Sequence, residues 1–180
     1  AVGHGSLLSN TTADNNTAVG YLALNLSTTG TQNTAIGAFA LDANTTASNL
    51  TAVGYNALSG NTTGTENTGI GRQALLTNST GGFNVAVGVN ALYQNSTANN
   101  NTAVGTSALA ANTTASFSTA LGSNSLTNNT TGSNNTAVGY DALGDNTTGA
   151  LNTAVGMQTL NKNTTGANNA AIGANALDAN

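Results

Sequence analysis

A glycine recurs at intervals of 17 residues along the chain, from Gly3 to Gly173, with no insertion or deletion. The repeat reads N-T-A-V-G-x-x-A-L-x-x-N-T-T-G-x-x. An aliphatic residue precedes each of these glycines, and a leucine follows four positions after each of them. Two aliphatic columns keep their register over eleven copies, which indicates that each copy stacks on the next. Disordered low-complexity sequence has no need to keep such a register.

The repeat is too short for helices, because 17 residues cannot hold two helices and two turns. Asn, Thr and Gly are also poor helix formers, and collagen would need Gly at every third position. We therefore predict an all-β fold, a parallel β-solenoid (β-roll) with one 17-residue coil per repeat and about ten coils. Residues 1–180 are expected to form a single repeat array, each coil holding two short strands near T-A-V and x-A-L.

The repeated glycine is expected to form the corner between the two strands. Glycine adopts positive φ readily and lets another backbone approach closely. The predicted corner glycines are Gly20, Gly37, Gly54, Gly71, Gly88, Gly105, Gly122, Gly139 and Gly156.

Strand alternation predicts which columns face inward. We expect the aliphatic column and the leucine column to form the core, with threonines such as Thr17 and Thr34 beside them. The alanine columns, such as those of Ala18 and Ala23, would then lie on the opposite, outer faces. The predicted core residues are Val19, Leu24, Ile36, Leu41, Val53, Leu58, Ile70, Leu75, Val87, Leu92, Val104, Leu109, Leu121, Leu126, Val138, Leu143, Val155 and Leu160.

Such a core is thin, with one aliphatic residue and one leucine per coil. Small alanines on an outer face would permit the close approach of another chain, so lateral association of solenoids is one interpretation. The other is that alanine simply tolerates a tight, solvated sheet. Open solenoid ends are also templates for further strand pairing, which predicts end-to-end stacking into filaments.

An asparagine in the N-T-T loop begins an N-x-S/T sequon in nearly every coil. These candidate glycosylation sites are Asn44, Asn61, Asn78, Asn95, Asn112, Asn129, Asn146 and Asn163. In a glycosylating pathway they could carry a line of glycans. The favoured alternative is that Asn and Thr serve as turn formers and side-chain ladders.

Composition excludes several classes of function. Charged residues are 4% of the chain, and Arg72 and Lys162 are the two basic ones, too few to neutralise nucleic acid phosphates. There is no cysteine and one histidine, so we expect no metal site and no cofactor. The six acidic residues are scattered and give no aligned pair for acid–base catalysis, so we expect no enzyme. No apolar run approaches the length of a membrane helix.

Aromatic residues are few and share columns. Tyr21, Tyr55 and Tyr140 occupy the position after the corner glycine, while Phe83 and Phe117 share another column two coils apart. Because a functional aromatic patch would need rings on adjacent coils, these side chains are expected to be exposed packing residues.

The segments N-T-A-V-G-Y-N-A-L and N-T-A-I-G resemble the head repeats of trimeric autotransporter adhesins, and the full 17-residue repeat resembles those of tail-fibre-like proteins. The resemblance rests on aliphatic–glycine pairs such as Val19–Gly20 and on alanine–leucine pairs such as Ala23–Leu24. It implies a left-handed parallel β-roll, usually in a homotrimer, displayed outside the cell. The repeat here is longer than that of the adhesin heads, with the extra residues in the N-T-T-G loop.

These observations together predict an extracellular or cell-surface structural fibre or adhesin segment. Its stiff solenoid rod would self-associate laterally or end to end. The expected partners are copies of the same chain, as a homotrimer or filament, and glycans or host surface ligands, with no nucleic acid and no membrane insertion. The alternative is an ice-binding β-solenoid that uses ladders of Thr and Asn, such as Thr45–Thr46 and Thr113–Thr114.

Overall fold

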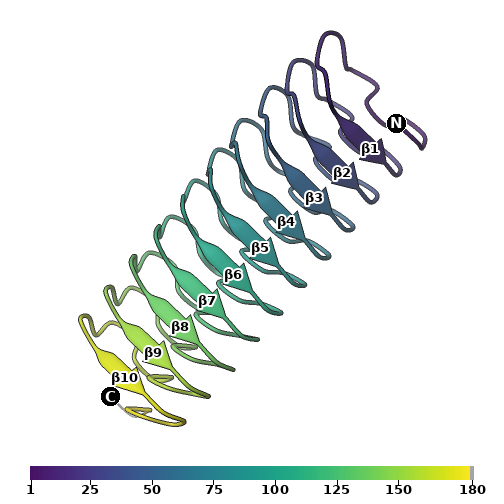
Figure 1. The fold of residues 1–180 in the computed structure, drawn as a ribbon. Coiled ribbons are helices and arrows are strands. Elements are labelled where there is room, and N and C mark those ends of the chain that lie inside the picture. Colours follow the sequence, from purple (N-terminus) through teal and green to yellow (C-terminus); the bar gives the residue numbers. More distant parts are fainter. Residues whose placement is uncertain (179–180) are drawn as a thin grey trace.

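The computed structural model describes residues 1–178 as a stack of coils whose ten short strands form one parallel sheet in chain order (Figure 1). The predicted all-β solenoid with one coil per 17 residues is therefore confirmed. The strands are β1 Thr17–Val19, β2 Thr34–Ile36, β3 Thr51–Val53, β4 Thr68–Ile70, β5 Val85–Val87, β6 Thr102–Val104, β7 Thr119–Leu121, β8 Thr136–Val138, β9 Thr153–Val155 and β10 Ala170–Ile172.

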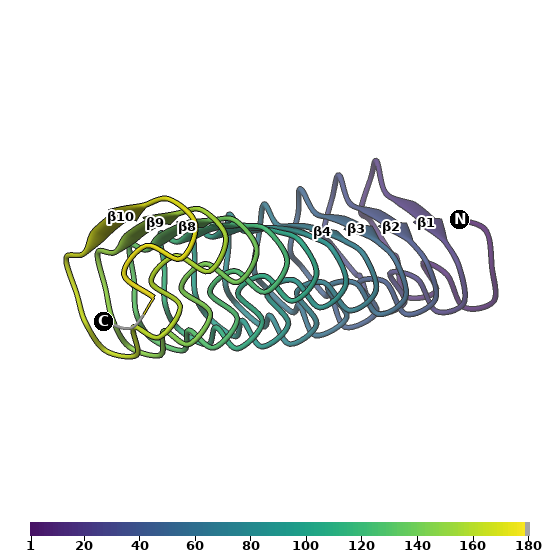
Figure 2. The same cartoon turned by 90° about the horizontal axis from the view of Figure 1, so that it is seen from below.

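The sheet register places each residue on its equivalent in the next coil. Thr34 pairs with Thr51, Ala35 with Ala52 and Ile36 with Val53, and the other strand pairs follow the same pattern. An isolated bridge between Val2 and Val19 extends the ladder toward the N-terminus. The result is a rod with the first and last described coils at opposite ends (Figures 1 and 2).

Each coil holds one strand, so the prediction of a second strand at x-A-L is wrong. The segment after the corner glycine is built from turns, with φ of 54° at Leu22 and 52° at Leu24. Residues in the left-handed region cannot continue an extended strand. The turns still bond coil to coil, since the Leu24 N–H donates to the Ala40 carbonyl oxygen at 2.9 Å.

The interior is made of alanine and leucine. Ala18, Ala23 and Leu24 and most of their equivalents in later coils are fully buried. The leucine column faces inward as predicted. The alanines were expected outside and lie inside, so that prediction is wrong. The buried leucines predicted as core are Leu24, Leu41, Leu58, Leu75, Leu92, Leu109, Leu126, Leu143 and Leu160.

The aliphatic column was predicted to face inward and instead faces outward, as Val19 and Ile36 show with 39% and 41% of their surface exposed. The interior is too narrow for these side chains: where Gly69 replaces alanine in β4, an added Cβ would lie 3.2 Å from Leu58 Cγ. The middle strand residue therefore points inward and its neighbours outward. The corrected residues are Val19, Ile36, Val53, Ile70, Val87, Val104, Leu121, Val138 and Val155.

The corner glycines have two reasons to be glycine. Their φ angles lie between 131° and 139° from Gly20 to Gly156, a region that side chains disfavour. In addition, a Cβ on Gly20 would lie 2.5 Å from the Gly37 carbonyl oxygen of the next coil. Any larger residue would force neighbouring coils apart.

Candidate interaction surface

The outward side of the sheet carries three parallel columns of side chains, which we call the outer sheet face. Alternate residues of a strand share one side, and the exposed–buried alternation of residues 83–87 shows the same pattern reaching two residues before the strand. The edge column lies two residues before each strand, the threonine column is the first strand residue, and the aliphatic column is the third. In coil five these positions hold Phe83, Val85 and Val87.

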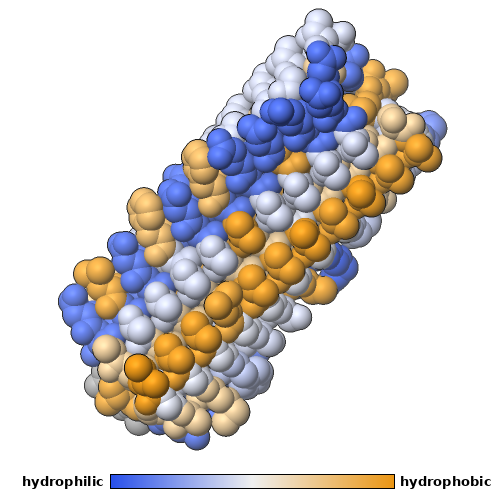
Figure 3. All heavy atoms as spheres, viewed as in Figure 1, coloured by the Kyte–Doolittle hydropathy of each residue, from blue (hydrophilic) through white to orange (hydrophobic). Residues whose placement is uncertain are grey.

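The aliphatic column forms a continuous apolar stripe along the rod (Figure 3). Val19, Ile36, Ile70, Val104 and Leu121 each keep 38–41% of their surface exposed. In-register pairing brings each of these side chains onto the next. A contiguous exposed apolar stripe of this kind is a candidate interaction surface.

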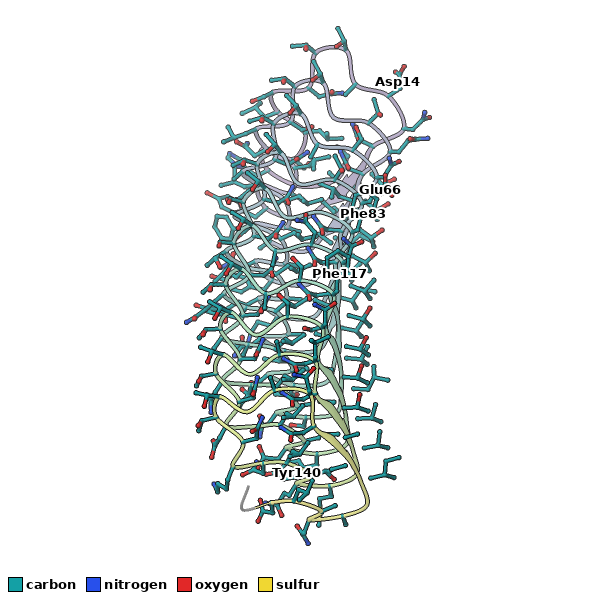
Figure 4. The ribbon with its side chains drawn as sticks, turned by 90° about the vertical axis from the view of Figure 1, so that its left-hand side faces the viewer. Asp14, Glu66, Phe83, Phe117 and Tyr140 are labelled. Atoms are coloured by element: carbon teal, nitrogen blue, oxygen red, sulfur yellow. The ribbon has the colours of Figure 1, made fainter. Side chains whose placement is uncertain are left out.

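Threonine begins every strand except β5 and β10, which begin with valine and alanine. Figure 4 shows the side chains of the sheet projecting away from the rod on this side. Within residues 1–178 these strand hydroxyls hold no hydrogen-bond partner in the protein, whereas the loop hydroxyl of Thr45 does. The column therefore offers unengaged hydroxyls beside an apolar stripe.

The edge column alternates in its second half. Asparagine, glutamine or glutamate fills it through Glu66, and from there it reads Phe83, Asn100, Phe117, Asn134 and Leu151. Phe83, Phe117 and Leu151 are 53%, 61% and 56% exposed.

The sequon asparagines are buried, from Asn44 to Asn163. The Asn95 side chain donates to Asn78 Oδ1 at 2.7 Å and to the Ala98 carbonyl oxygen at 3.1 Å. Equivalent bonds to the carbonyl oxygen three residues ahead hold every member of the column: Asn44, Asn61, Asn78, Asn95, Asn112, Asn129, Asn146 and Asn163. Because the nitrogen that a glycan would occupy is buried and hydrogen-bonded inside the coil, the folded rod does not present these residues to solvent, in keeping with the ladder interpretation.

A second amide column was missed by the sequence reasoning. Asn84 N–H donates to Asn67 Oδ1 at 2.9 Å, and Asn84 Nδ2 donates to the Ala98 carbonyl oxygen at 2.8 Å. Leu50 and Ser118 replace asparagine in this column. The available signal was the asparagine that begins the repeat consensus, directly before the first strand.

The loop threonines form a third ladder. Thr113 Oγ1 donates to the Thr130 carbonyl oxygen at 3.1 Å, and Thr130 Oγ1 donates to that of Thr147 at 3.0 Å. Of the residues named for ice binding, the first threonine of each pair, such as Thr45 and Thr113, and the sequon asparagines are thus engaged within the rod. The second loop threonine, such as Thr46 and Thr114, is exposed.

Aromatic rings gather over the first coils, contrary to the expectation that they are isolated. His4 stacks on Tyr21 with ring centroids 5.5 Å apart. Phe39 lies edge-to-face against Tyr21 at 5.3 Å and against Tyr55 at 6.1 Å. Phe39 comes from the next column along, which is why column counting alone left Tyr21 and Tyr55 unconnected.

Charged groups are sparse on the described rod. Lys162 Nζ lies 2.9 Å from Asp145 Oδ2 at the surface. Burial raises the pKa of Asp42, against the lowering effect of backbone hydrogen bonds from Asp42 and Ala43.

Residues 1–178 contain no group of three or more His, Cys, Asp or Glu side chains arranged to hold a metal ion. In the same residues no helix is long and apolar enough to cross a bilayer.

Comparison with protein-family models, with curated proteins and with solved structures gives no match to this chain. The fold nevertheless defines a class of protein: this is a rod-like β-solenoid repeat protein with 17-residue coils.

Proposed function

We propose that the protein is a structural rod of an extracellular fibre or adhesin, and that copies associate laterally through the outer sheet face. The observation that carries this proposal is the continuous aliphatic column on that face. Burial of apolar surface drives association at roughly 25 cal/mol per Å² removed from water. A column repeated in every coil adds this gain along the whole length of two aligned rods.

Association through this face would bury almost no charged side chain. Its aliphatic and threonine columns contain no charged residue, and Glu66 is the one charged member of the described edge column. Two such faces can therefore meet without burying an unpaired charge, which would be costly. The alanine columns cannot serve as the interface, because they are inside the coil.

The resemblance to adhesin head repeats supports a homotrimer displayed at the cell surface. Several outer sheet faces around a common axis would shield the aliphatic columns while leaving the loops outside. This role needs no cofactor and no catalytic group, in keeping with the sparse charged residues.

The test is the native mass of the purified chain, measured by light scattering over a range of concentrations. We expect a discrete oligomer for the native chain and a smaller species for the combined variant Val87→Thr, Val104→Thr and Leu121→Thr. The control Thr97→Ser, Thr114→Ser and Thr131→Ser changes exposed loop positions and should keep the native mass. A native chain that stays monomeric at high concentration contradicts the proposal.

Ice binding is a second candidate function, and the candidate ice-binding residues are the strand threonines in place of the loop threonines. Their unengaged hydroxyls and the neighbouring methyl groups repeat at the coil spacing, roughly 4.8 Å. Thermal hysteresis and ice-crystal shaping measure this directly. Their absence in a monomeric sample would remove the candidate, and their presence would place it above the fibre role.

A further inference from the structure

The edge column carries large apolar residues where the backbone disfavours them. Phe83, Phe117 and Leu151 have φ of 60°, 61° and 60°, in the left-handed region where asparagine is enriched and bulky side chains are rare. Asn49, Asn100 and Asn134 adopt the same conformation in the same column. The three apolar residues therefore cost stability and, being more than half exposed, gain little burial in return.

These apolar residues recur at every second coil. Since neighbouring coils are roughly 4.8 Å apart, the spacing between Phe83 and Phe117 is roughly 10 Å. Between them stands the exposed Asn100, and Asn134 stands between Phe117 and Leu151. Unlike Asn99, whose amide donates to the Thr97 carbonyl oxygen, Asn100 and Asn134 hold no side-chain partner within residues 1–178.

We propose that Phe83, Asn100, Phe117, Asn134 and Leu151 form a binding row for an extended, uncharged β-1,4-linked glycan chain. In such a polymer each sugar ring is turned over relative to the last, so equivalent ring faces recur at every second sugar. One ring advances the chain by a length close to one coil. Apolar C–H faces would pack on the aromatic rings and Leu151, and hydroxyls of the intervening sugars would bond the free amides.

The alternation distinguishes this partner from others. A second copy aligned coil on coil would present the same group at every coil, so it would match a continuous column such as the aliphatic column. It would not match a column that alternates apolar and amide groups. A phosphate-bearing polymer would need basic side chains, and this row has none. The inference assigns the edge column to a ligand and leaves the aliphatic and threonine columns of the outer sheet face free for lateral association, so it does not depend on that association.

The experiment is a titration of the full chain with β-1,4-linked glucose and N-acetylglucosamine hexasaccharides, followed by calorimetry. Maltohexaose, which is α-1,4-linked and curls, is the matched control ligand. We expect at least one β-linked probe to bind, and maltohexaose to bind at least tenfold more weakly or not at all.

The key variant is Phe83→Asn, Phe117→Asn and Leu151→Asn. It installs the residue that the column holds elsewhere, so the variant should fold with equal or higher thermal stability while its affinity for the β-linked probe falls at least tenfold. The control Tyr140→Thr removes an exposed ring outside the row and should keep the affinity. Unchanged binding by the triple variant, or no binding of either β-linked probe to the native chain, overturns the proposal. A fall in native mass in the triple variant also overturns it and assigns the row to self-association.

Discussion

Asn95 Nδ2 donates to Asn78 Oδ1 across one coil at 2.7 Å, and Asn78 Nδ2 donates in turn to Asn61 Oδ1 at 2.8 Å. Each of these amides also donates to a carbonyl oxygen in its own turn. Both hydrogens of the side chain are therefore used inside the rod. This chain of buried amides satisfies the turn backbone while linking coil to coil, and it gives the apolar interior a polar seam.

Removing one amide from this seam should be costly. Asn95→Ala would leave Asn78 Oδ1, Asn112 Nδ2 and the Ala98 carbonyl oxygen each short of one hydrogen bond. Asn78 Oδ1 would be left with no partner, while the Ala98 carbonyl oxygen and Asn112 Nδ2 would each keep one, and a buried polar group left unpaired costs about 1–3 kcal/mol. We expect a loss of at least that size in the free energy of unfolding, measured by chemical denaturation. The exposed neighbour variant Gln94→Ala should stay within about 0.5 kcal/mol of the native chain.

Filling the gap in the seam should stabilise the rod. Ser27 occupies this column, and its buried hydroxyl has no partner. Ser27→Asn would place an amide near Asn10 Oδ1 and the Gly30 carbonyl oxygen, as in the later coils. We expect a gain of about 1 kcal/mol, read as a rise in the melting temperature. Ser27→Ala removes only the unpaired hydroxyl and should be nearly neutral; a larger gain for Ala than for Asn would contradict the amide explanation.

The corner glycines should not tolerate even a methyl group. Gly105 has φ of 135°, and an added Cβ would lie 2.5 Å from the Gly122 carbonyl oxygen. Because backbone strain and steric clash add, we expect Gly105→Ala to lower the free energy of unfolding by more than about 3 kcal/mol. The matched control is Ala103→Gly in the strand of the same coil, which reproduces the native Gly69 of β4 and should cost about 1 kcal/mol. Thermal unfolding of both variants provides the comparison, and equal losses would argue against a special role for the corner.

Stability near the N-terminal end should fall as the carboxyl group of Asp42 ionises. Burial raises the pKa of Asp42 above 3.8, so between 3.8 and the folded pKa the native state binds more protons than the unfolded state. Stability from this group is full below pH 3.8 and is lost as the pH rises through the folded pKa. Asp42→Asn should therefore be more stable than the native chain at pH 7. Melting temperatures measured from pH 7 down to pH 3 should show this advantage shrinking; an advantage that grows on acidification would contradict the sign.

The period of the sequence was sufficient to predict the coil, the parallel register and the inward leucines. It failed at the strand, where both Ala18 and Val19 are apolar and alternation alone does not say which points inward. The answer depends on the width of the interior, which is set by the close stacking at the corner glycines and by Leu24 opposite the strand. Hydrophobicity favoured valine for the core, while the available space admits only a methyl group.

The candidate surface was harder to predict for the same reason. Once the aliphatic column was assigned to the core, no apolar stripe remained for the outside. The amide columns were easier, because asparagine at a fixed position of every turn already suggested a ladder. The direction of the Phe83 and Phe117 side chains depends on the left-handed backbone conformation of these residues. The repeat consensus does not predict that conformation.

From Phe83 to Leu151 the edge column repeats every two coils, whereas the sheet repeats every coil. Gain or loss of a single 17-residue unit would leave the hydrogen-bond ladders, the corners and the aliphatic column intact. Gain or loss of one unit between Phe83 and Phe117 would change the spacing of these two apolar residues by one coil. The regular alternation of apolar and amide residues would then be lost. The chain can therefore change length freely as a rod, whereas its edge column keeps its pattern only when length changes by pairs of coils.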